Sequence, residues 1–505
     1  RPPEGWGLST EFQYDPVPQL LLDIDAGAGT RLTKFDGDLA PVDFLRRDVT
    51  SLAHFLRPNA DVLIVGSGGG RDVLTALVFD QASVRAVEMN PEIVDAVNDT
   101  FGVLNGHLDR DPRVDFVVDE ARSYLARIDE EFDILQISLI DTWAATAAGA
   151  FVLSENSLYT VEAYEIFLKR LRDDGVLSVS RRYQGNNPGE MLRLTTLAAR
   201  ALLNAGAENP RDHIVITKSN FAGATQDGSE PDGVATLLVC RRPFVAQELD
   251  QLDANLAENG FEIVLSPRFA GSDLFAELAD PETMDAAIAA HALNLAPPTD
   301  DSPFFFNMLR FRDIFNEQLR NDEIGRAGNL KAVYILGLLV LVVFAMTLLL
   351  IVPPLVLTLD WRAIRSASRF VAYFAGIGLG FMLVEISQLQ RLIVFLGHPV
   401  YGLTVVLFAV LLSSGCGSFA SARIDSDQLG TRGVQVLIGL LVALLAYARV
   451  SPFSMDAFAP ATTPATSRPP RRPRHSVSWV TSHSRASGRS ARSTAKASKS
   501  TSRSW

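Results

Sequence analysis

The stretch VLIVGSGGGRD, residues 62–72, decides the fold, because an apolar run passes directly into a loop of glycines. The run predicts a buried strand at Asp61–Val65, and Arg71–Phe79 after the loop predicts a helix. Glycines at such a turn let the chain reverse tightly and let a ligand approach the backbone closely. The N–H groups at the start of the helix favour an anionic group. The candidate binding residues in the loop are Gly66, Ser67, Gly68 and Gly70.

The next predicted strand, Val84–Glu88, ends in an acid 22 residues after Gly66. An acid about 20 residues beyond a glycine loop hydrogen-bonds ribose hydroxyls in nucleoside-binding sheets. Glu88 therefore favours a nucleoside site over the alternative, a surface charge beside a helix. Asn90 and Pro91 follow it, as expected at the start of a helix.

The third predicted strand, Val114–Val118, leads into Asp119 and Glu120. An acid at this place can meet the exocyclic amine of adenine. Asp119 can also cap the helix expected at Ala121–Ile128, and one Asp can do both. Asp119 and Glu120 are therefore further candidates for binding the nucleoside.

The fourth predicted strand, Asp133–Ile137, is followed by Ser138, Asp141 and Trp143. The carboxyl ends of the strands in an open α/β sheet border the ligand crevice. Ser138 and Trp143 are therefore candidates for contact with an acceptor. Asp141 is the candidate catalytic residue, because a carboxylate can orient or deprotonate an amine. Its alternative role is that of a turn residue.

Strands and helices alternate, with a helix expected at Glu92–Phe101 and a strand at Gly175–Ser180, as far as a late strand at Ala235–Cys240. This alternation predicts a mostly parallel sheet of about seven strands with helices on both faces. Four apolar runs follow, at Val333–Ile351, Phe370–Ile386, Val400–Ala420 and Val434–Tyr447. They predict three or four membrane helices, with buried core helices as the alternative. We expect an N-terminal β element (1–57), the α/β domain (58–243), a helical and loop extension (244–330), a membrane region (331–450) and a disordered basic tail (451–505).

Charge and cysteine content narrow the function further. The net charge is −12, although the last 38 residues, Arg468–Trp505, carry ten Lys or Arg and no Asp or Glu. The remaining acidic surface gives no support for nucleic-acid binding. Cys240 and Cys416 form no disulfide framework or zinc site, and we expect no metal. The chain begins at Arg1 without a leader, so we expect it to be truncated at the front.

From about Leu20 to Cys240 the chain resembles the spermidine synthase (aminopropyltransferase) family, within the S-adenosylmethionine-dependent transferases. The matching pieces are LDID (22–25), the glycine loop, VEMNP (87–91), VDEA (118–121) and SLYT (157–160). The likeness is closest to bacterial proteins that join this domain to membrane helices. GLGFMLVE (378–385) and FLGHPVY (395–401) are typical of their membrane part.

The resemblance implies a Rossmann-like class I S-adenosyl-transferase fold and a role in polyamine biosynthesis. It implies S-adenosylmethionine or its decarboxylated form as co-substrate and an amine or other small acceptor. Gly66, Gly68 and Gly70 would cradle the methionine-like part, Glu88 the ribose, and Asp119 the adenine. The protein would be a multi-pass bacterial inner-membrane protein in contact with lipid, with the transferase domain in the cytoplasm. A homodimer is left open.

Two departures from the family pattern bear on the reaction. The family carries Asp where Gly69 stands, and an Asp-x-x-Asp-Pro motif whose first acid acts on the attacking amine. Ser138 stands at that first place and Asp141 at the second. Aminopropyl transfer to an unusual amine and methyl transfer both remain open. A protein of a different class, a membrane transporter or scaffold with a degenerate transferase domain, is the alternative.

Overall fold

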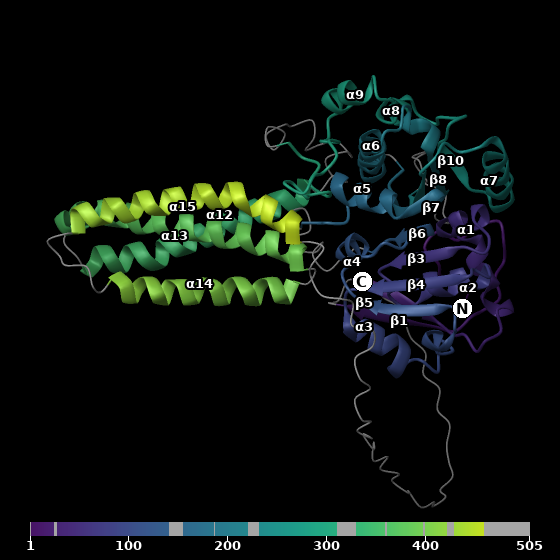
Figure 1. The fold of residues 1–505 in the computed structure, drawn as a ribbon, viewed down its shortest axis with the longest axis horizontal. Helices are drawn as coiled ribbons and strands as arrows, with labels where there is room; N and C mark the ends of the chain where they lie inside the picture. The colour runs from purple at the N-terminus through teal and green to yellow at the C-terminus, as the bar shows by residue number, and fades with distance from the viewer. Residues whose placement is uncertain are drawn as a thin grey trace, which may run out of the picture. The chain divides into compact units, whose positions relative to one another are not determined.

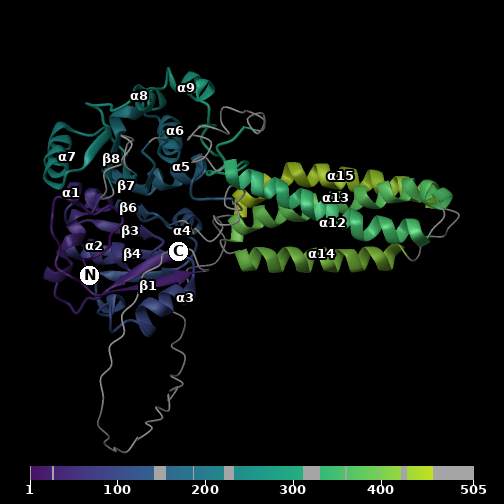
Figure 2. The same cartoon turned by 180° about the vertical axis from the view of Figure 1, so that it is seen from behind.

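The computed structural model describes residues 2–24, 28–140, 155–185, 187–220, 232–310, 330–358, 361–396, 399–421 and 429–458. These residues form an α/β domain built on one large sheet, followed by four long helices (Figure 1). The view from behind shows the helices of the domain lying on both sides of the sheet (Figure 2). The predicted class, an α/β sheet domain followed by C-terminal helices, is confirmed.

The large sheet has eight strands in the order β10-β8-β9-β7-β6-β3-β4-β5. The strands from β3 to β7 are parallel to one another, whereas β9 runs antiparallel to β7 and β8, and β10 antiparallel to β8. Their bounds are β3 Asp61–Val65, β4 Ser83–Glu88, β5 Val114–Val118, β6 Phe132–Ser138, β7 Leu171–Tyr183, β8 Ile214–Asn220, β9 Gly233–Cys240 and β10 Glu262–Leu265.

Alternation along each strand divides the apolar core between the two faces of the sheet. In β3, Leu63 and Val65 face one core, which also holds side chains of α4 (Ala121–Arg127), α5 (Val161–Lys169) and α6 (Gly189–Asn204). Val62 and Ile64 face the other core, together with α1 (Leu52–Leu56), α2 (Arg71–Val78) and α7 (Ala246–Asn259). Both faces are therefore covered, as a parallel sheet requires.

The predicted N-terminal β element is a two-stranded antiparallel hairpin, β1 (Gln19–Ile24) and β2 (Ala28–Thr33). Two short 3₁₀ helices, η1 (Ala40–Arg47) and η2 (Val49–Ser51), lead from it to α1. Asp48 caps η2, because its side chain accepts a hydrogen bond from the Thr50 N–H. This connection brings the N-terminal part of the chain onto the sheet.

Three elements differ from the sequence prediction. The helix expected at Glu92–Phe101 is α3 (Pro91–Asp95) followed by a π-helical turn, η3 (Ala96–Thr100). The strand expected at Gly175–Ser180 extends over all of β7, because pairing with β6 on one side and β9 on the other carries it beyond its apolar run. The sheet also has one strand more than expected.

The additional strand, β10, comes from the segment for which only helices and loops are expected. It adds to the sheet beside β8 and is followed by α8 (Asp273–Leu278) and α9 (Met284–Ala290). The end of this segment is held by the buried Arg193 of α6, which donates to the carbonyl oxygens of Ala296, Phe304, Phe305 and Asn307. Phe305 and Phe306 lie in the core.

The C-terminal helices are α12 (Leu330–Thr358), α13 (Trp361–Leu396), α14 (Pro399–Ser421) and α15 (Leu429–Phe458). Two stretches, Arg369–Gln390 and Tyr401–Ala420, are long and apolar enough to cross a membrane, and α12 and α15 contain shorter apolar stretches. Their large apolar side chains are mostly exposed, in contrast to those of the sheet domain.

Candidate functional site

The glycine loop after β3 turns at three left-handed glycines. Gly66, Gly68 and Gly70 have φ angles of 72°, 48° and 81°, a region that residues with a Cβ rarely adopt. The Gly66 N–H donates to the Val87 carbonyl oxygen at 2.8 Å, which ties the loop to β4. Gly70 is the residue that caps α2. The spacing of the glycines therefore sets the path of the loop.

The β1–β2 hairpin lies directly against this loop. The Gly69 N–H donates to Thr30 Oγ1 at 2.8 Å. A Cβ at Gly69 would lie 2.5 Å from the Arg31 carbonyl oxygen, closer than a Cβ comes to another heavy atom. Because that oxygen belongs to the backbone of β2, a change of rotamer cannot relieve the contact. The hairpin therefore closes the position at which the resembled family carries an Asp. This contact was not predicted from the sequence.

Glu88 ends β4 with its carboxylate turned toward the loop. Its Oε2 accepts from the Gly68 N–H and its Oε1 from the Asn90 N–H, both at 3.1 Å. The side chain is only 8% exposed, and each carboxylate oxygen keeps a lone pair for a further donor. A carboxylate held in this way can accept two hydrogen bonds from a pair of vicinal hydroxyls.

Asp119 and Glu120, after β5, have different roles in the structure. The Asp119 carboxylate accepts from the Glu120 N–H at 2.8 Å and forms an ion pair with Arg127. Burial raises the pKa of Asp119, and the charge of Arg127 opposes this rise. Glu120 is the cap of α4 and accepts from the N–H groups of Arg122 and Ser123 at 3.1 and 2.7 Å. Glu120, and not Asp119, is therefore the residue that caps α4.

Ser138 ends β6 and is 6% exposed. Leu139 after it has a φ of 47°, which is rare for a residue with a Cβ and common near functional sites. The Ile140 side chain lies 2.7 Å from the position that a Cβ of Gly66 would take. The end of β6 therefore packs against the glycine loop. Asp141 and Trp143 lie outside the described residues.

A second carboxyl group, Asp72, lies in the first turn of α2. Its side chain is buried and has an oxygen, Oδ1, with no partner in the described part of the chain. Burial raises the pKa of Asp72, whereas the charge of Arg71 and the Ser138 hydroxyl lower it. Arg71 itself is buried in an ion pair with Asp48. Asp72 ends the stretch 62–72 that decides the fold, but it is not among the candidate residues chosen from the sequence.

The structure brings three of the candidate residues, Gly68, Glu88 and Asp119, next to one another. Glu88 bonds to the loop at Gly68, and its carbonyl oxygen accepts from the Asp119 N–H at 3.1 Å. Two exposed apolar side chains, Met89 and Val118, stand at the ends of β4 and β5 beside these acids. Neither was singled out from sequence, although exposed apolar residues at strand ends are a usable signal.

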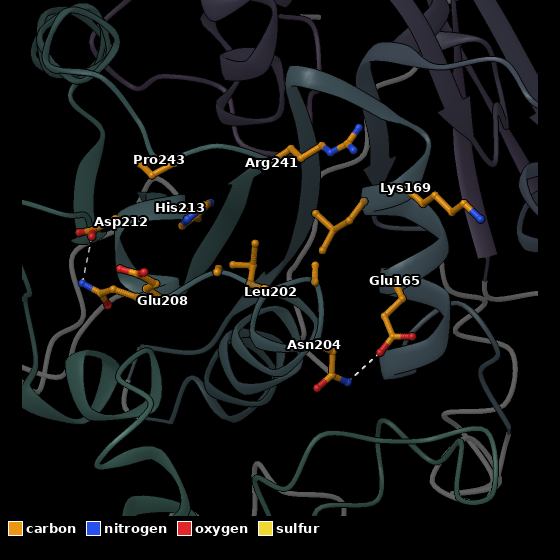
Figure 3. Close-up of a pocket in the computed structure, with 14 residues that line it drawn as sticks. Glu165, Lys169, Leu202, Asn204, Glu208, Asp212, His213, Arg241 and Pro243 are labelled. Atoms are coloured by element: carbon orange, nitrogen blue, oxygen red, sulfur yellow. Dashed lines mark hydrogen bonds between the residues drawn. The ribbon is translucent and has the colours of Figure 1, made fainter.

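A pocket of about 670 Å³ lies away from the glycine loop (Figure 3). It is lined by the carboxyl-terminal ends of α5 and α6 and by residues at the start of β8 and the end of β9, among them Glu165, Leu202, Asp212 and Arg241. Hydrogen bonds join Asn204 to Glu165 and Asn209 to Asp212 across its wall. These residues adjoin the amino ends of the parallel strands, at the edge of the sheet opposite to the glycine loop.

Comparison with known proteins finds relatives of the part of the chain that contains the glycine loop. Residues 43–195 match the model of the spermine/spermidine synthase domain. A polyamine aminopropyltransferase of Korarchaeum cryptofilum is 26% identical over 116 residues, which cover 23% of this chain and 33% of that protein. Polyamine aminopropyltransferase 2 of Pseudomonas aeruginosa is 33% identical over 123 residues, covering 24% of this chain and 32% of that protein.

The chain thus spans about a third of the length of these curated relatives. Among solved structures, spermidine synthase from Thermotoga maritima is 15% identical with a TM-score of 0.31, over 55% of this chain and 86% of that one. The matched segment, residues 43–195, contains the glycine loop, Glu88, Asp119 and Ser138, and it is similar to the spermine/spermidine synthase domain.

Proposed function

We propose that this chain, whose residues 43–195 form a spermidine synthase-like domain, is a membrane-anchored transferase that moves a group from an S-adenosyl donor to an amine. The observation that carries the proposal is the left-handed glycine loop closed onto Glu88, the acid at the end of the adjacent strand. Parallel sheets bind nucleosides at this position, where strand ends meet the start of a helix.

Each part of the donor has a group suited to it. Glu88 would accept the ribose hydroxyls with its remaining lone pairs. Asp119 would accept from the adenine amine, and the exposed side chains of Met89 and Val118 would flank the ring. The methionine-like part would lie along the backbone of the glycine loop, beside the hydroxyl of Ser67, which has no hydrogen-bond partner among the described residues.

The acceptor amine would lie beyond the end of β6, at Ser138, with Asp141 and Trp143 as its predicted neighbours. The sulfonium of the donor is already an activated leaving group. Holding the amine in line with the carbon to be transferred therefore supplies much of the rate. The residues of the described site bind and orient the two reactants.

The C-terminal helices would anchor the transferase in a lipid bilayer. Two of their stretches reach membrane-spanning length, and their apolar side chains, such as Phe370, Leu383 and Phe408, are largely exposed. Exposed apolar area of this extent favours lipid over water. We expect the full chain to stay with the membrane after washing at alkaline pH, and release into the wash would contradict the anchor.

Calorimetry on the full chain in detergent micelles tests the donor site. S-adenosylmethionine, its decarboxylated form and methylthioadenosine would be titrated separately, with thermal unfolding used to show that the protein is folded. Tighter binding of the decarboxylated form would indicate aminopropyl transfer, and tighter binding of the carboxylated form methyl transfer. Absence of binding by all three would overturn the proposal and favour a scaffold or transport protein. Only the serine at position 138, in place of the family's acid, supports that alternative.

A further inference from the structure

The pocket at the amino ends of the parallel strands carries negative charge that ion pairs do not balance. Three acids of its lining, Glu165, Glu208 and Asp212, form no ion pair with any residue in the described part of the chain. Glu165 accepts a hydrogen bond from the neutral amide of Asn204 at 2.7 Å. Asp212 accepts one from the amide of Asn209 at 3.1 Å. Unpaired carboxylates that line a concave surface attract cations.

The two basic side chains of the lining leave these acids unneutralised. Arg241 donates to the Leu171 carbonyl oxygen at 2.6 Å. Its guanidinium also lies 3.8 Å from the carboxylates of Glu131 and Asp173, which do not line the pocket. Lys169 points away from the centre of the pocket (Figure 3). The helices α5 and α6 both end at the pocket wall, and the carbonyl groups at a helix end add partial negative charge.

The acids stand on two sides of an apolar floor. In Figure 3, Glu165 lies on one side of Leu202, and Leu202 is 2% exposed. Glu208 and Asp212 lie on its other side. Within the described residues, no three His, Cys, Asp or Glu side chains are grouped as a metal ion would need. Carboxylates spread around an apolar floor suit an elongated organic cation better than a metal ion, which gathers its ligands at one point.

A buried histidine offers the pocket a further acceptor. His213 belongs to the lining and is 6% exposed. Its Nδ1 lies 3.0 Å from the Cys240 carbonyl oxygen, which can only accept, so Nδ1 carries the proton of the neutral ring. Nε2 then keeps a lone pair, and no residue in the described part of the chain donates to it. An ammonium group, which only donates, matches this acceptor.

We propose that this pocket binds a linear polyamine, a chain of methylene groups with an ammonium group at each end. Glu208 and Asp212 would hold one ammonium, to which His213 offers Nε2, and Glu165 would hold the other. The methylene groups would lie over Leu202. The pocket is at the opposite edge of the sheet from the glycine loop, so a ligand here leaves the donor site open. The site goes beyond the proposed transferase function and does not depend on it.

Calorimetry on the full chain in detergent micelles tests the site, with spermidine and butylamine as probes. Butylamine has a single ammonium group and can occupy only one end of the pocket. A hydrogen bond between charged groups contributes about tenfold or more to an affinity, so we expect spermidine to bind at least about tenfold more tightly. Glu208→Gln and Asp212→Asn, introduced together, keep the side-chain shapes and remove both charges. This double variant should bind spermidine at least about tenfold more weakly than the wild type.

Asp273→Asn with Glu277→Gln is the matched control. These acids of α8 have the same spacing of four residues, and they do not line the pocket. The control should bind spermidine like the wild type. Amine bound near Ser138 should be unaffected by either pair of changes, so a loss confined to the first pair belongs to the pocket. Both double variants should bind methylthioadenosine like the wild type.

The outcomes separate the two proposals. Spermidine binding that survives Glu208→Gln and Asp212→Asn unchanged would overturn the polyamine site, and so would equal affinities for spermidine and butylamine. An equal loss of binding in the α8 control would also overturn it, because the attraction would then belong to the acidic surface as a whole. A wild-type protein that binds spermidine in this pocket but binds no S-adenosyl compound would overturn the transferase function alone.

Discussion

The two halves of the site differ in where their carboxylates come from. In the donor half, formed by the glycine loop, Glu88 and Asp119, the acids stand at strand ends, where the nucleoside-binding pattern expects them. In the proposed acceptor half, at Ser138, the strand end carries a hydroxyl, and the nearby buried carboxyl group, Asp72, comes from a helix. The two halves of the proposed site therefore take their carboxyl groups from different kinds of element.

The largest expected effect is on donor binding, and it comes from the contact between the glycine loop and the hairpin. Gly69→Asp restores the acid of the resembled family but drives its Cβ into the Arg31 carbonyl oxygen. Overpacking against backbone costs about 3 kcal/mol, so we expect donor binding to weaken by about 100-fold in calorimetry. Gly271→Ala is the control, since its Cβ would make only ordinary contacts. Unchanged binding in Gly69→Asp would show that the hairpin does not close the loop.

The buried histidine of α1, His54, gives the next effect. The pKa of His54 is about 4 in the folded protein, against 6.5 ordinarily. Between these values the unfolded chain binds a proton that the folded chain does not. The free energy of unfolding should therefore fall by up to about 3 kcal/mol as the pH drops from about 6.5 to about 4. Urea unfolding of His54→Gln should lack this part of the pH dependence.

His107→Asn is the matched replacement for that experiment. His107 is more exposed than His54 and does not belong to the buried hydrogen bonds that join Gln81, His54 and Gln136. It should keep the pH dependence of the wild type. An equal loss of pH dependence in both variants would contradict the assignment of the effect to His54.

A smaller effect is expected from the ribose-binding acid. Glu88→Gln keeps the shape of the side chain but replaces one acceptor oxygen with a donor, facing either Gly68 or Asn90 N–H. We expect about tenfold weaker binding of methylthioadenosine in calorimetry, equivalent to about 1.4 kcal/mol. Glu92→Gln, an exposed acid in the first turn of α3, should bind like the wild type. Equal binding by both variants would remove Glu88 from the site.

The smallest effect concerns stability at Asp72. Because burial raises the pKa of this group, the ionised form is disfavoured in the folded protein. Asp72→Asn should therefore be more stable than the wild type near neutral pH, by less than about 1 kcal/mol, and equal to it in acid, where Asp72 is protonated. Asp273→Asn, in the first turn of α8, serves as the control in the same denaturation series. A variant less stable at neutral pH would mean that the charge of Asp72 stabilises the fold.

Much of the donor half is predictable from the sequence. The strands β3 and β5 have the expected bounds, Asp61–Val65 and Val114–Val118, because apolar runs between turn residues leave little choice of register. The extra strand β10 was missed, since its four residues form a strand only by pairing with β8. Short strands take their structure from their partners more than from their own composition.

The sequence by itself determined the glycine loop and the acids after β4 and β5, because their geometry depends on residues a few positions apart. Left-handed turns need glycine, and a residue that ends a parallel strand lies at the same sheet edge as its neighbours. Only the tertiary structure decided that the hairpin closes the loop at Gly69 and that Asp72 of α2 is buried. The contact of Gly69 with Arg31 joins residues about 40 positions apart, and no local pattern encodes such a closure.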